Sequence, residues 1–394
     1  MAIKVRELLA MTPDNVLEKI GQDVCIDKPN QKLTGMIMYK VLLYTIAKTT
    51  RVSLRIMESI YASPLFKTMT GMPDQKTRHS SFADRLSKIK PVYFATIFEY
   101  LVNKYNAQLE KKDGKSIYRF DSTIIGLSAK LFTAGMNYSG LKNNLHLKIT
   151  IGQRGIIPNI VRFFTNQSEA SEDIALKKTI CEAIIDQEDF VIFDRGISAG
   201  KTFIELSEKD ITFVTRLKID RKINVIESMK LPVDELNEQE VKLIILSDQK
   251  VQIWNNNKGK FFDIPFRLIK AKSLKSQEEI YFFTNNFFCS AYEITELYKR
   301  RWDIEVFFRF IKQELNFKHF LARNLNGLKS YLYMVLILAI LLLIYKTSNN
   351  KPGYKIVKME FIQELENEVL AELIKFCGGD PEIFWERFFP KDAC

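Results

Sequence analysis

The run YLYMVLILAILLLIY, residues 331–345, constrains the fold of this chain most, because its fifteen residues leave no polar side for solvent. A helix that crosses a membrane needs about 20 such residues. Lys329 and Lys346 border the run closely, so it is too short to span a bilayer comfortably. We therefore expect a helix that is buried on all sides in the core of a folded domain, and we expect no membrane partner.

The charge of the chain favours a polyanionic partner. Its 394 residues include 58 Lys and Arg against 47 Asp and Glu, which gives a net charge of +11. Residues 1–112 hold 18 basic and 10 acidic side chains, so most of the surplus lies there. Nucleic acid is the partner that such a surplus suggests. A basic helix over 77–90 could enter a major groove, or it could be the solvated face of a plain helical bundle.

The few histidines and cysteines exclude several kinds of site. Five cysteines are scattered without a C-x-x-C pair, which fits free thiols in a reducing cytoplasm and gives no zinc site. Three histidines leave little material for a His-rich metal centre or a Ser/His/Asp triad. The first residues, MAIKVRELLAM, lack an unbroken apolar segment, so we expect no secretory signal and a cytoplasmic protein.

Helical spacing dominates the first part of the chain. Apolar residues recur with that spacing over 36–48, 52–61 and 91–108, and convincing strand alternation is lacking. The polar run KKDGKS at 111–116 then breaks the pattern. We therefore predict a helical DNA-binding domain over residues 1–112.

After this break the hydrophobic period changes to two, which indicates β-strands. The expected order is strands at 117–125, 145–152 and 159–164, a helix over 171–186, the strand FVIF, a helix over 199–208 and the strand ITFVTRLK. This order predicts an α/β domain over 113–346, with a mixed sheet flanked by helices.

Residues 220–285 look like a β-rich insertion into that domain. The short apolar runs KLIILS, KVQIW, FFDIPFRLI and EIYFFTN are separated there by the polar turns NNNKGK and KSLKSQ. A helix over about 290–318 and the buried run follow, and residues 347–394 are expected to form a C-terminal helical segment.

The stretch YKRRWDIEVFFRFIK, 298–312, places one acid among several bases. At 100° per residue, Tyr298, Glu305 and Lys312 fall within roughly a 40° arc, with Arg301 about 60° to one side. A neighbouring apolar stripe would anchor the helix on a core. The alternative is a solvated charged face in which Arg301 pairs with Glu305 four residues later.

Two aspartates lie where ionised groups are unusual. Asp121 is inside an apolar strand, and Asp194 ends the strand FVIF at an edge where ligand sites form in α/β sheets. Asp121 could instead accept hydrogen bonds at a sheet edge, and Asp194 with Gly196 could simply make a turn. Together with Glu305 they offer three carboxylates of the kind that Mg²⁺ or Mn²⁺ prefers, and two such ions could drive phosphodiester chemistry.

The spacing of these residues resembles a known family. Tyr298, Arg301, Glu305 and Lys312 have the Y-x2-R-x3-E-x6-K spacing of the DDE transposases of the insertion-sequence-four family. FDST around Asp121 and FDRG around Asp194 resemble the strands that bear that family's two aspartates. The resemblance covers about residues 77–345. It implies an RNase H-like fold with an insertion before the catalytic glutamate.

The resemblance also implies cut-and-paste DNA transposition. Asp121, Asp194 and Glu305 would be the catalytic residues and would hold two Mg²⁺ ions, with Mn²⁺ as a substitute, while water and then a freed 3′-hydroxyl attacks phosphodiesters. Family members typically pass through a hairpin and act as a dimer on two paired ends. The partners would be double-stranded transposon ends, read at terminal inverted repeats, and target DNA, in the bacterial cytoplasm at the nucleoid.

The same resemblance suggests contacts to the cleaved DNA. Tyr298, Arg301 and Lys312 would be the DNA-binding residues. Trp302 and Trp254 are candidates to stack on an unpaired base, although a core or interface role is the simpler interpretation. His146 and Lys148 could approach the site or decorate a sheet edge, and they stay outside the catalytic set.

Two other functions use the same features. An RNase H-like nuclease would cut without strand transfer, but it would not need a basic helical domain that reads DNA ends. A catalytically idle DNA-binding descendant would not need Asp121, Asp194 and Glu305 together.

Overall fold

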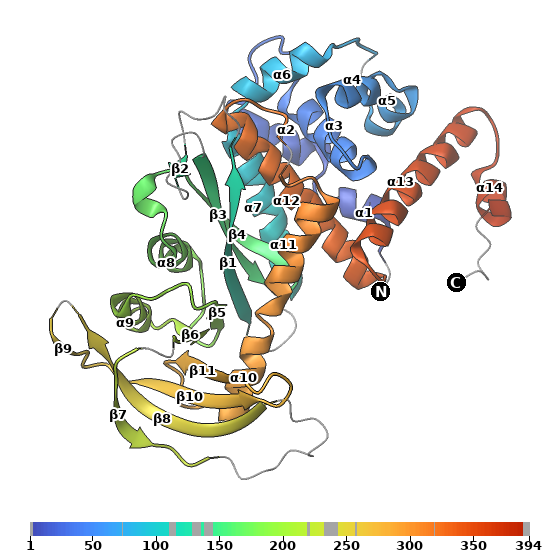
Figure 1. The fold of residues 1–394 in the computed structure, drawn as a ribbon. Helices are drawn as coiled ribbons and strands as arrows, with labels where there is room; N and C mark the ends of the chain where they lie inside the picture. The colour runs from blue at the N-terminus through green and yellow to red at the C-terminus, as the bar shows by residue number, and fades with distance from the viewer. Residues whose placement is uncertain are drawn as a thin grey trace. The chain divides into compact units, whose positions relative to one another are not determined.

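A computed structural model describes the chain over residues 3–72, 74–109, 116–127, 135–137, 145–218, 221–231, 243–256, 258–318 and 320–388. Contacts divide it into two compact units. One unit combines 1–111 with 309–394, and the other is 112–308. We refer to them as the helical unit and the sheet unit, and Figure 1 gives the elements of each.

The helical unit contains the helices expected over 36–48, 52–61 and 91–108, which are confirmed as α3, α4 and α7. Thr34 accepts a hydrogen bond from the backbone N–H of Ile37 and so caps α3, and Pro91 opens α7. The helices of this unit are α1 (Val5–Leu9), α2 (Asp14–Asp23), α3 (Gly35–Lys48), α4 (Leu54–Ala62), α5 (Pro64–Thr70), α6 (His79–Lys88), α7 (Pro91–Leu109), α12 (Leu325–Ser348), α13 (Tyr354–Phe376) and α14 (Pro381–Phe388).

The apolar run 331–345 lies in α12 and is buried throughout, apart from the half-buried Tyr333. By length and composition α12 could cross a membrane, but 89% of its most apolar 18-residue window is buried inside the protein. It packs on α3, α7 and α13. The predicted core helix is thus confirmed, but its domain differs from the expected 113–346. A helix that is apolar on all sides needs other helices around it, and the helical unit supplies them.

The sheet unit carries one sheet of 11 strands in its described part. Helices α8 (Glu172–Glu182), α9 (Gly200–Glu208) and α10 (Ala291–Lys299) pack on it, and α11 (Trp302–Glu314) follows α10 and continues into the helical unit. The strands are β1 (Ile117–Gly126), β2 (Met136–Asn137), β3 (Leu145–Arg154), β4 (Ile157–Phe164), β5 (Phe190–Phe193), β6 (Thr212–Arg216), β7 (Ile223–Ser228), β8 (Leu243–Asn255), β9 (Lys260–Phe261), β10 (Phe266–Ser273) and β11 (Glu279–Thr284).

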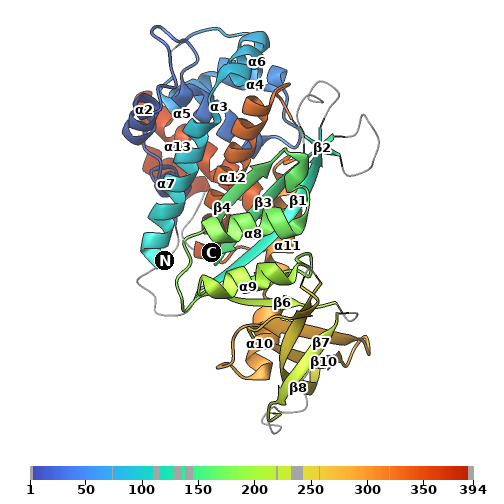
Figure 2. The same ribbon diagram turned by 90° about the vertical axis from the view of Figure 1, so that its left-hand side faces the viewer.

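Strand order follows the RNase H-like arrangement. β4, β3 and β1 pair antiparallel, and β1, β5 and β6 then run parallel. The insertion extends the same sheet, because β11 pairs antiparallel with β6. Beyond β11 the strand order continues outward as β10, β8 and β7. Figure 2 shows these strands from a second side. The mixed sheet flanked by helices is therefore confirmed.

Successive side chains of the central strands point to opposite faces of the sheet and pack into two separate hydrophobic cores. Val191 and Phe193 of β5 point to one face, where they pack with Phe203 of α9. Ile192 points to the other face and packs with Ile294 of α10. Helices α8 and α9 thus cover one face of the sheet and α10 the other, as Figure 1 shows.

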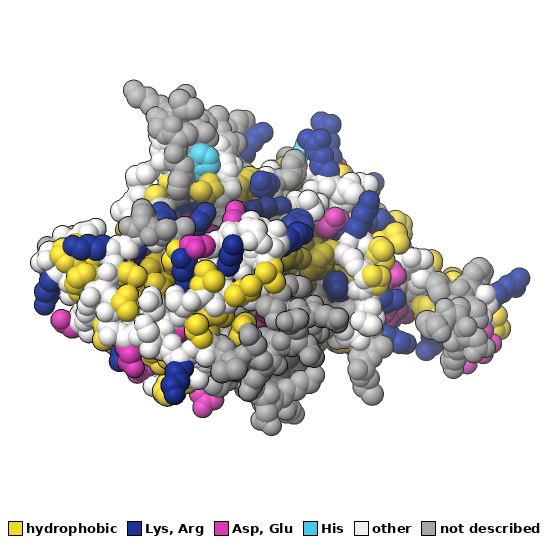
Figure 3. Space-filling model, turned by 60° about the horizontal axis from the view of Figure 1, so that its bottom comes forward, with side chains coloured by type: hydrophobic (Ala, Val, Ile, Leu, Met, Phe, Trp, Pro, Cys, Tyr) yellow, Lys and Arg dark blue, Asp and Glu magenta, His cyan; other side chains and the backbone are white. Residues whose placement is uncertain are grey.

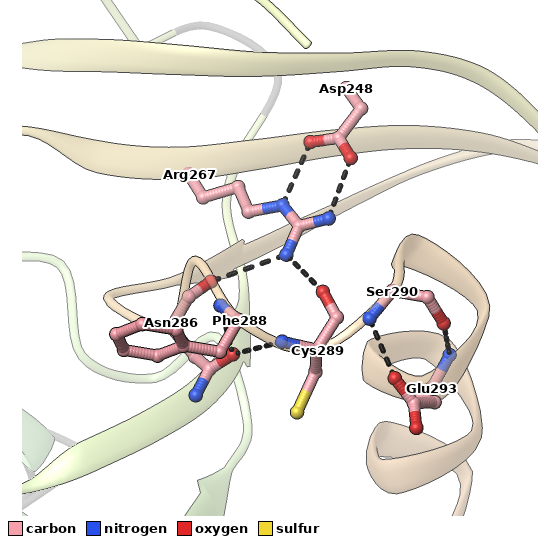
Figure 4. Close-up of polar contacts among 7 residues, drawn as sticks. All are labelled: Asp248, Arg267, Asn286, Phe288, Cys289, Ser290 and Glu293. Carbon is pink, nitrogen blue, oxygen red and sulfur yellow. Dashed lines mark hydrogen bonds and ion pairs between the residues drawn. The ribbon is translucent and has the colours of Figure 1, made fainter. Parts of the chain in front are cut away.

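Two expected strands of the insertion are a single strand. The described residues of both runs, LIILS and KVQIW, belong to the 13-residue β8, which continues through the polar residues between them. Asp248 in that interval accepts hydrogen bonds from Nε and Nη2 of Arg267 in β10, at 2.9 and 2.7 Å, and both side chains are almost fully buried (Figure 4). A buried ion pair therefore lies between the two apolar runs that the sequence suggested were separate short strands.

The same arginine fixes the start of α10. Nη1 of Arg267 donates hydrogen bonds to the carbonyl oxygens of Cys289 and Asn286, at 2.5 and 3.4 Å. Ser290 and Glu293 then close a capping box around the first turn of α10 (Figure 4). The insertion thereby sets where the helix that carries Tyr298 begins.

Candidate active site

Asp121, inside β1, and Asp194, directly after β5, occupy adjacent positions in the sheet. β1 and β5 pair in parallel with Phe120 opposite Phe193, and each aspartate is the next residue in its chain. Paired strands lie about 4.8 Å apart, so the two carboxylates start from adjacent positions. Both phenylalanines point toward α8 and α9, and alternation turns Asp121 to the opposite face, where α10 packs.

Burial shapes the ionisation of Asp121. It raises the pKa of Asp121 to about 6, and the neighbouring carboxylates Glu172 and Asp194 act in the same direction. The hydrogen bond from the backbone N–H of Ser122 and the charge of Arg301 oppose this shift. A carboxylate that gathers with others in a half-buried place is a common sign of a functional site.

Tyr298 holds Asp194 from the side of α10. Its hydroxyl donates a hydrogen bond to Oδ1 of Asp194 over 3.1 Å. Its ring is buried edge-on against Phe282, with centroids 5.4 Å apart. Burial, followed by the charge of Asp194, raises the pKa of Tyr298 to about 12, so the hydroxyl keeps its proton at neutral pH. The hydroxyl therefore acts as a fixed donor to this carboxylate.

Arg301 lies among the three carboxylates predicted from the sequence. Its Nη2 donates to Oε1 of Glu305 at 2.5 Å, and the arginine side chain is only 13% exposed. Its charge also acts on Asp194 and Asp121. The i,i+4 pairing foreseen as an alternative therefore exists, but in a largely buried place beside the aspartates.

The helix expected over 290–318 is in fact broken. α10 ends at Lys299 and α11 begins at Trp302. At the junction the backbone N–H of Arg301 bonds to the carbonyl of Tyr298, three residues back, which is the tighter 3₁₀ pattern. The predicted 40° stripe from Tyr298 to Glu305 does not apply across this turn.

Arg119 of β1 holds this junction. Its Nε donates to the carbonyl oxygen of Arg300 at 2.6 Å, and Nη2 forms an ion pair with Asp303 at 3.0 Å. Arg119 is buried, and it stands two residues before Asp121 on the same strand. Sequence reasoning missed it. The only signal was a cation inside the apolar strand IYRFDSTII.

A fourth carboxylate, Glu172 at the start of α8, was also missed. It accepts hydrogen bonds from Oγ of Ser122 at 2.9 Å and from Nζ of Lys148 at 2.8 Å. Lys148 is fully buried between β1 and β4, so it does not decorate a sheet edge. A Cβ on Gly196 would lie 3.0 Å from Cγ of Glu172, so glycine at this position leaves room for the Glu172 side chain.

The donors of this site suit a divalent cation in their chemistry. Asp121 and Asp194 offer carboxylate oxygens from adjacent positions, whereas Glu305 binds Arg301. Within the described ranges, no three Asp, Glu, His or Cys side chains lie close enough together to hold one ion. Lys312 lies two turns after Glu305 on α11, on the same stripe of that helix.

A cavity of about 650 Å³ lies next to Tyr298 and Arg301. Leu243, Ile280 and Phe282 line it, with the cations Arg216, Lys275 and Lys299 and with Trp302, which is 53% exposed. Trp254 lines a different cavity, where Phe261 packs edge-on against it. The two tryptophans singled out from the sequence therefore stand in separate places.

Comparison with known proteins identifies relatives of this chain. The family described as the transposase DDE domain matches residues 112–342. The protein y4zB of Sinorhizobium fredii, provisionally named a transposase, is 26% identical over 257 residues, which cover 65% of this chain and 68% of the relative. A protein of Synechocystis, provisionally named the transposase of insertion sequence element IS4SA, is 21% identical over 294 residues, or 74% and 79% of the two chains.

Among solved structures, the piggyBac transposase synaptic complex with hairpin DNA aligns with a TM-score of 0.49 and 10% identity. The alignment covers 93% of this chain and 81% of that chain.

Proposed function

The chain belongs to the family of transposase DDE domains and is a metal-dependent transposase, and we propose that it moves an insertion sequence by cut-and-paste DNA transposition. On this proposal Asp121, Asp194 and Glu305 hold two Mg²⁺ ions, with Mn²⁺ as a substitute. The observation that carries the assignment is the parallel register of β1 and β5, which sets the two aspartates side by side. When bound, the ions would activate the attacking oxygen and stabilise the leaving oxygen of a phosphodiester.

The surrounding residues hold those carboxylates in position. The hydroxyl of Tyr298 restrains Asp194 through its hydrogen bond, and Arg119 holds the junction that sets the direction of Arg301 and Glu305. Because carboxylates that bind an ion must be deprotonated, the raised pKa of Asp121 makes metal binding sensitive to mild acid.

DNA is the proposed partner on both sides of the reaction. Tyr298, Arg301 and Lys312 would contact the backbone of the cleaved strand, through a hydroxyl donor and two cations. The helical unit carries the basic surplus of residues 1–112 and would read the terminal inverted repeats. Two copies would act on two paired ends in the bacterial cytoplasm.

The first experiment is cleavage of the flanking element ends by purified protein with Mg²⁺. Asp194→Asn and Glu305→Gln each remove one charge and keep side-chain size, so both should abolish cleavage while DNA binding persists. Asp263→Asn, an exposed position in the insertion, is the matched control and should cleave normally.

The products separate the proposed function from its alternatives. Cleavage followed by joining to a second DNA supports a transposase. Nicking without joining would show a nuclease of the same fold. Binding without cleavage in either Mg²⁺ or Mn²⁺ would show an idle descendant.

A further inference from the structure

A second cavity, of about 460 Å³, adjoins the loop that follows Asp194, and we call it the α9-side cavity. Among the described residues, its lining includes four cations and no carboxylate. The cations come from two loops: Arg195 follows β5, and Lys218, Arg221 and Lys222 lie between β6 and β7. Such a concentration of positive charge suits the phosphates of a nucleic acid backbone.

The wall of this cavity is held in place by several hydrogen bonds. Asp173 accepts from the backbone N–H groups of Ser198 and Ala199, at 2.8 and 2.7 Å, and from the hydroxyl of Ser198 at 2.9 Å. Nη1 of Arg221 donates to the carbonyl oxygen of Ser198 at 2.6 Å. The loop after Asp194 is thus tied to α8 on one side and to the β6–β7 connection on the other.

An aromatic side chain completes the cavity. Trp254 of β8 is half-buried, and Nζ of Lys222 lies 3.5 Å from the centroid of its ring. Cations interleaved with aromatic surface are typical of nucleic-acid contacts. Figure 3 brings the insertion forward and shows Lys and Arg side chains interspersed with hydrophobic ones over its surface.

This cavity and the one beside Tyr298 lie on opposite faces of the sheet. Arg216 ends β6 and lines the Tyr298 cavity, whereas the next residue, Leu217, lines the α9-side cavity. Leu217 belongs to the core under α8 and α9, and Tyr298 belongs to the core under α10. Asp194 stands between the two, since Arg195 directly after it already lines the second cavity.

We propose that the α9-side cavity binds backbone phosphates of the target duplex. This inference rests on the proposed function, because strand transfer brings two DNA segments to one set of carboxylates. The cleaved end is assigned to the face with Tyr298 and Arg301, which leaves the opposite face for the second segment. Successive nucleotides rise about 3.4 Å along one strand, so phosphates close to one at Asp194 come within reach of Arg195 and the lysines.

The test separates joining from cleavage. In the double variant Lys218→Gln/Lys222→Gln two charges are lost from the cavity, and in the matched control Lys209→Gln/Lys230→Gln two are lost from exposed positions elsewhere in the sheet unit. With uncut ends, all three proteins should cleave alike.

With precut ends and a plasmid target, the cavity variant should join about tenfold less DNA than the control at low target concentration, and its joining should recover at high target concentration. For binding to a target duplex, the slope of the logarithm of the affinity against the logarithm of the salt concentration should be smaller in magnitude by about two in the cavity variant.

Other outcomes would overturn the proposal. Joining that equals the control at every target concentration shows that the cavity does not hold target DNA. Loss of cleavage together with joining, in a variant of normal melting temperature, assigns the cavity to the element end instead. Fluorescence anisotropy of a labelled duplex needs no activity, so weaker binding by the cavity variant alone would support a DNA site even if the wild type did not cleave.

Discussion

Nη2 of Arg301 lies 2.5 Å from Oε1 of Glu305, one of the three carboxylates proposed to bind metal. The charge of this guanidinium also acts on Asp194 and Asp121. A positive charge in this position stabilises carboxylates that would otherwise repel one another. An ion that binds Glu305 has to compete with the arginine for the same oxygen.

Arg301→Gln should therefore strengthen metal binding although it weakens the enzyme. The variant frees Glu305 and removes a cation that repels the ion, so Mn²⁺ affinity should rise about tenfold, from a charged hydrogen bond of about 1.5 kcal/mol. The Mn²⁺ affinity can be measured by titration, with the free Mn²⁺ concentration followed by electron paramagnetic resonance. Arg300→Gln, an exposed neighbour with the same charge change, should leave the affinity unchanged. Equal or weaker Mn²⁺ binding by Arg301→Gln would show that Arg301 does not compete with the ion.

Tyr298→Phe should slow cleavage without loosening the fold. The ring stays packed on Phe282, and only the hydrogen bond to Asp194 is lost. A hydrogen bond to a charged group contributes about 1.5–3 kcal/mol, so the single-turnover rate should fall about tenfold or more. Tyr281→Phe removes a hydroxyl that donates to the exposed Glu279 and serves as the control. A Tyr298→Phe rate within twofold of the wild type would remove Tyr298 from the positioning of Asp194.

Asp121→Asn should stabilise the protein when no metal is bound. Asp121 has a pKa of about 6 against an ordinary 3.8, so between these values the folded state binds more protons than the unfolded state. Stability from this group is therefore present below pH 3.8 and is lost as the pH rises through 6. Two pKa units correspond to about 3 kcal/mol.

The melting temperature in EDTA measures this effect. For a chain of this size, Asp121→Asn should melt about 3–5 °C higher than the wild type at pH 8, with little difference at pH 4. Added Mg²⁺ should stabilise the wild type more than the variant, since only the wild type keeps this ligand. A difference that stays the same from pH 4 to pH 8 would contradict the raised pKa of Asp121.

Arg267→Met should destabilise the sheet unit strongly. It leaves Asp248 buried without its ion-pair partner, which costs about 3–5 kcal/mol. The double variant Arg267→Met/Asp248→Leu replaces both charges with apolar groups and should recover most of the loss. Thermal melting by circular dichroism compares the two. A double variant as unstable as the single one would mean that the bonds from Arg267 to Cys289 and Asn286 matter more than the ion pair.

Local patterns in the sequence were enough to predict much of the fold. Helical spacing located α3, α4 and α7, alternation located β1, β3 and β4, and the length of the apolar run identified the buried α12. These properties depend on neighbours a few residues apart, which the chain carries directly.

The candidate site was only partly visible in the same way. Asp121 and Asp194 could be selected as carboxylates at unusual strand positions, and the structure adds their parallel register. Glu172 gave no signal, because an acid at a helix start is ordinary. Its importance comes from Lys148 of β3 and Ser122 of β1, which bind its carboxylate from the sheet.

Tertiary structure alone decided how distant parts of the chain meet. Arg119 and Arg300 are 181 residues apart, yet their hydrogen bond holds the break between α10 and α11. Asp248 lies between two apolar runs that looked like separate short strands, and its ion pair with Arg267 of the neighbouring strand places it inside one continuous strand. Periodicity tells each segment which side to bury, but many strand orders and registers satisfy the same pattern, and only packing in three dimensions selects one of them.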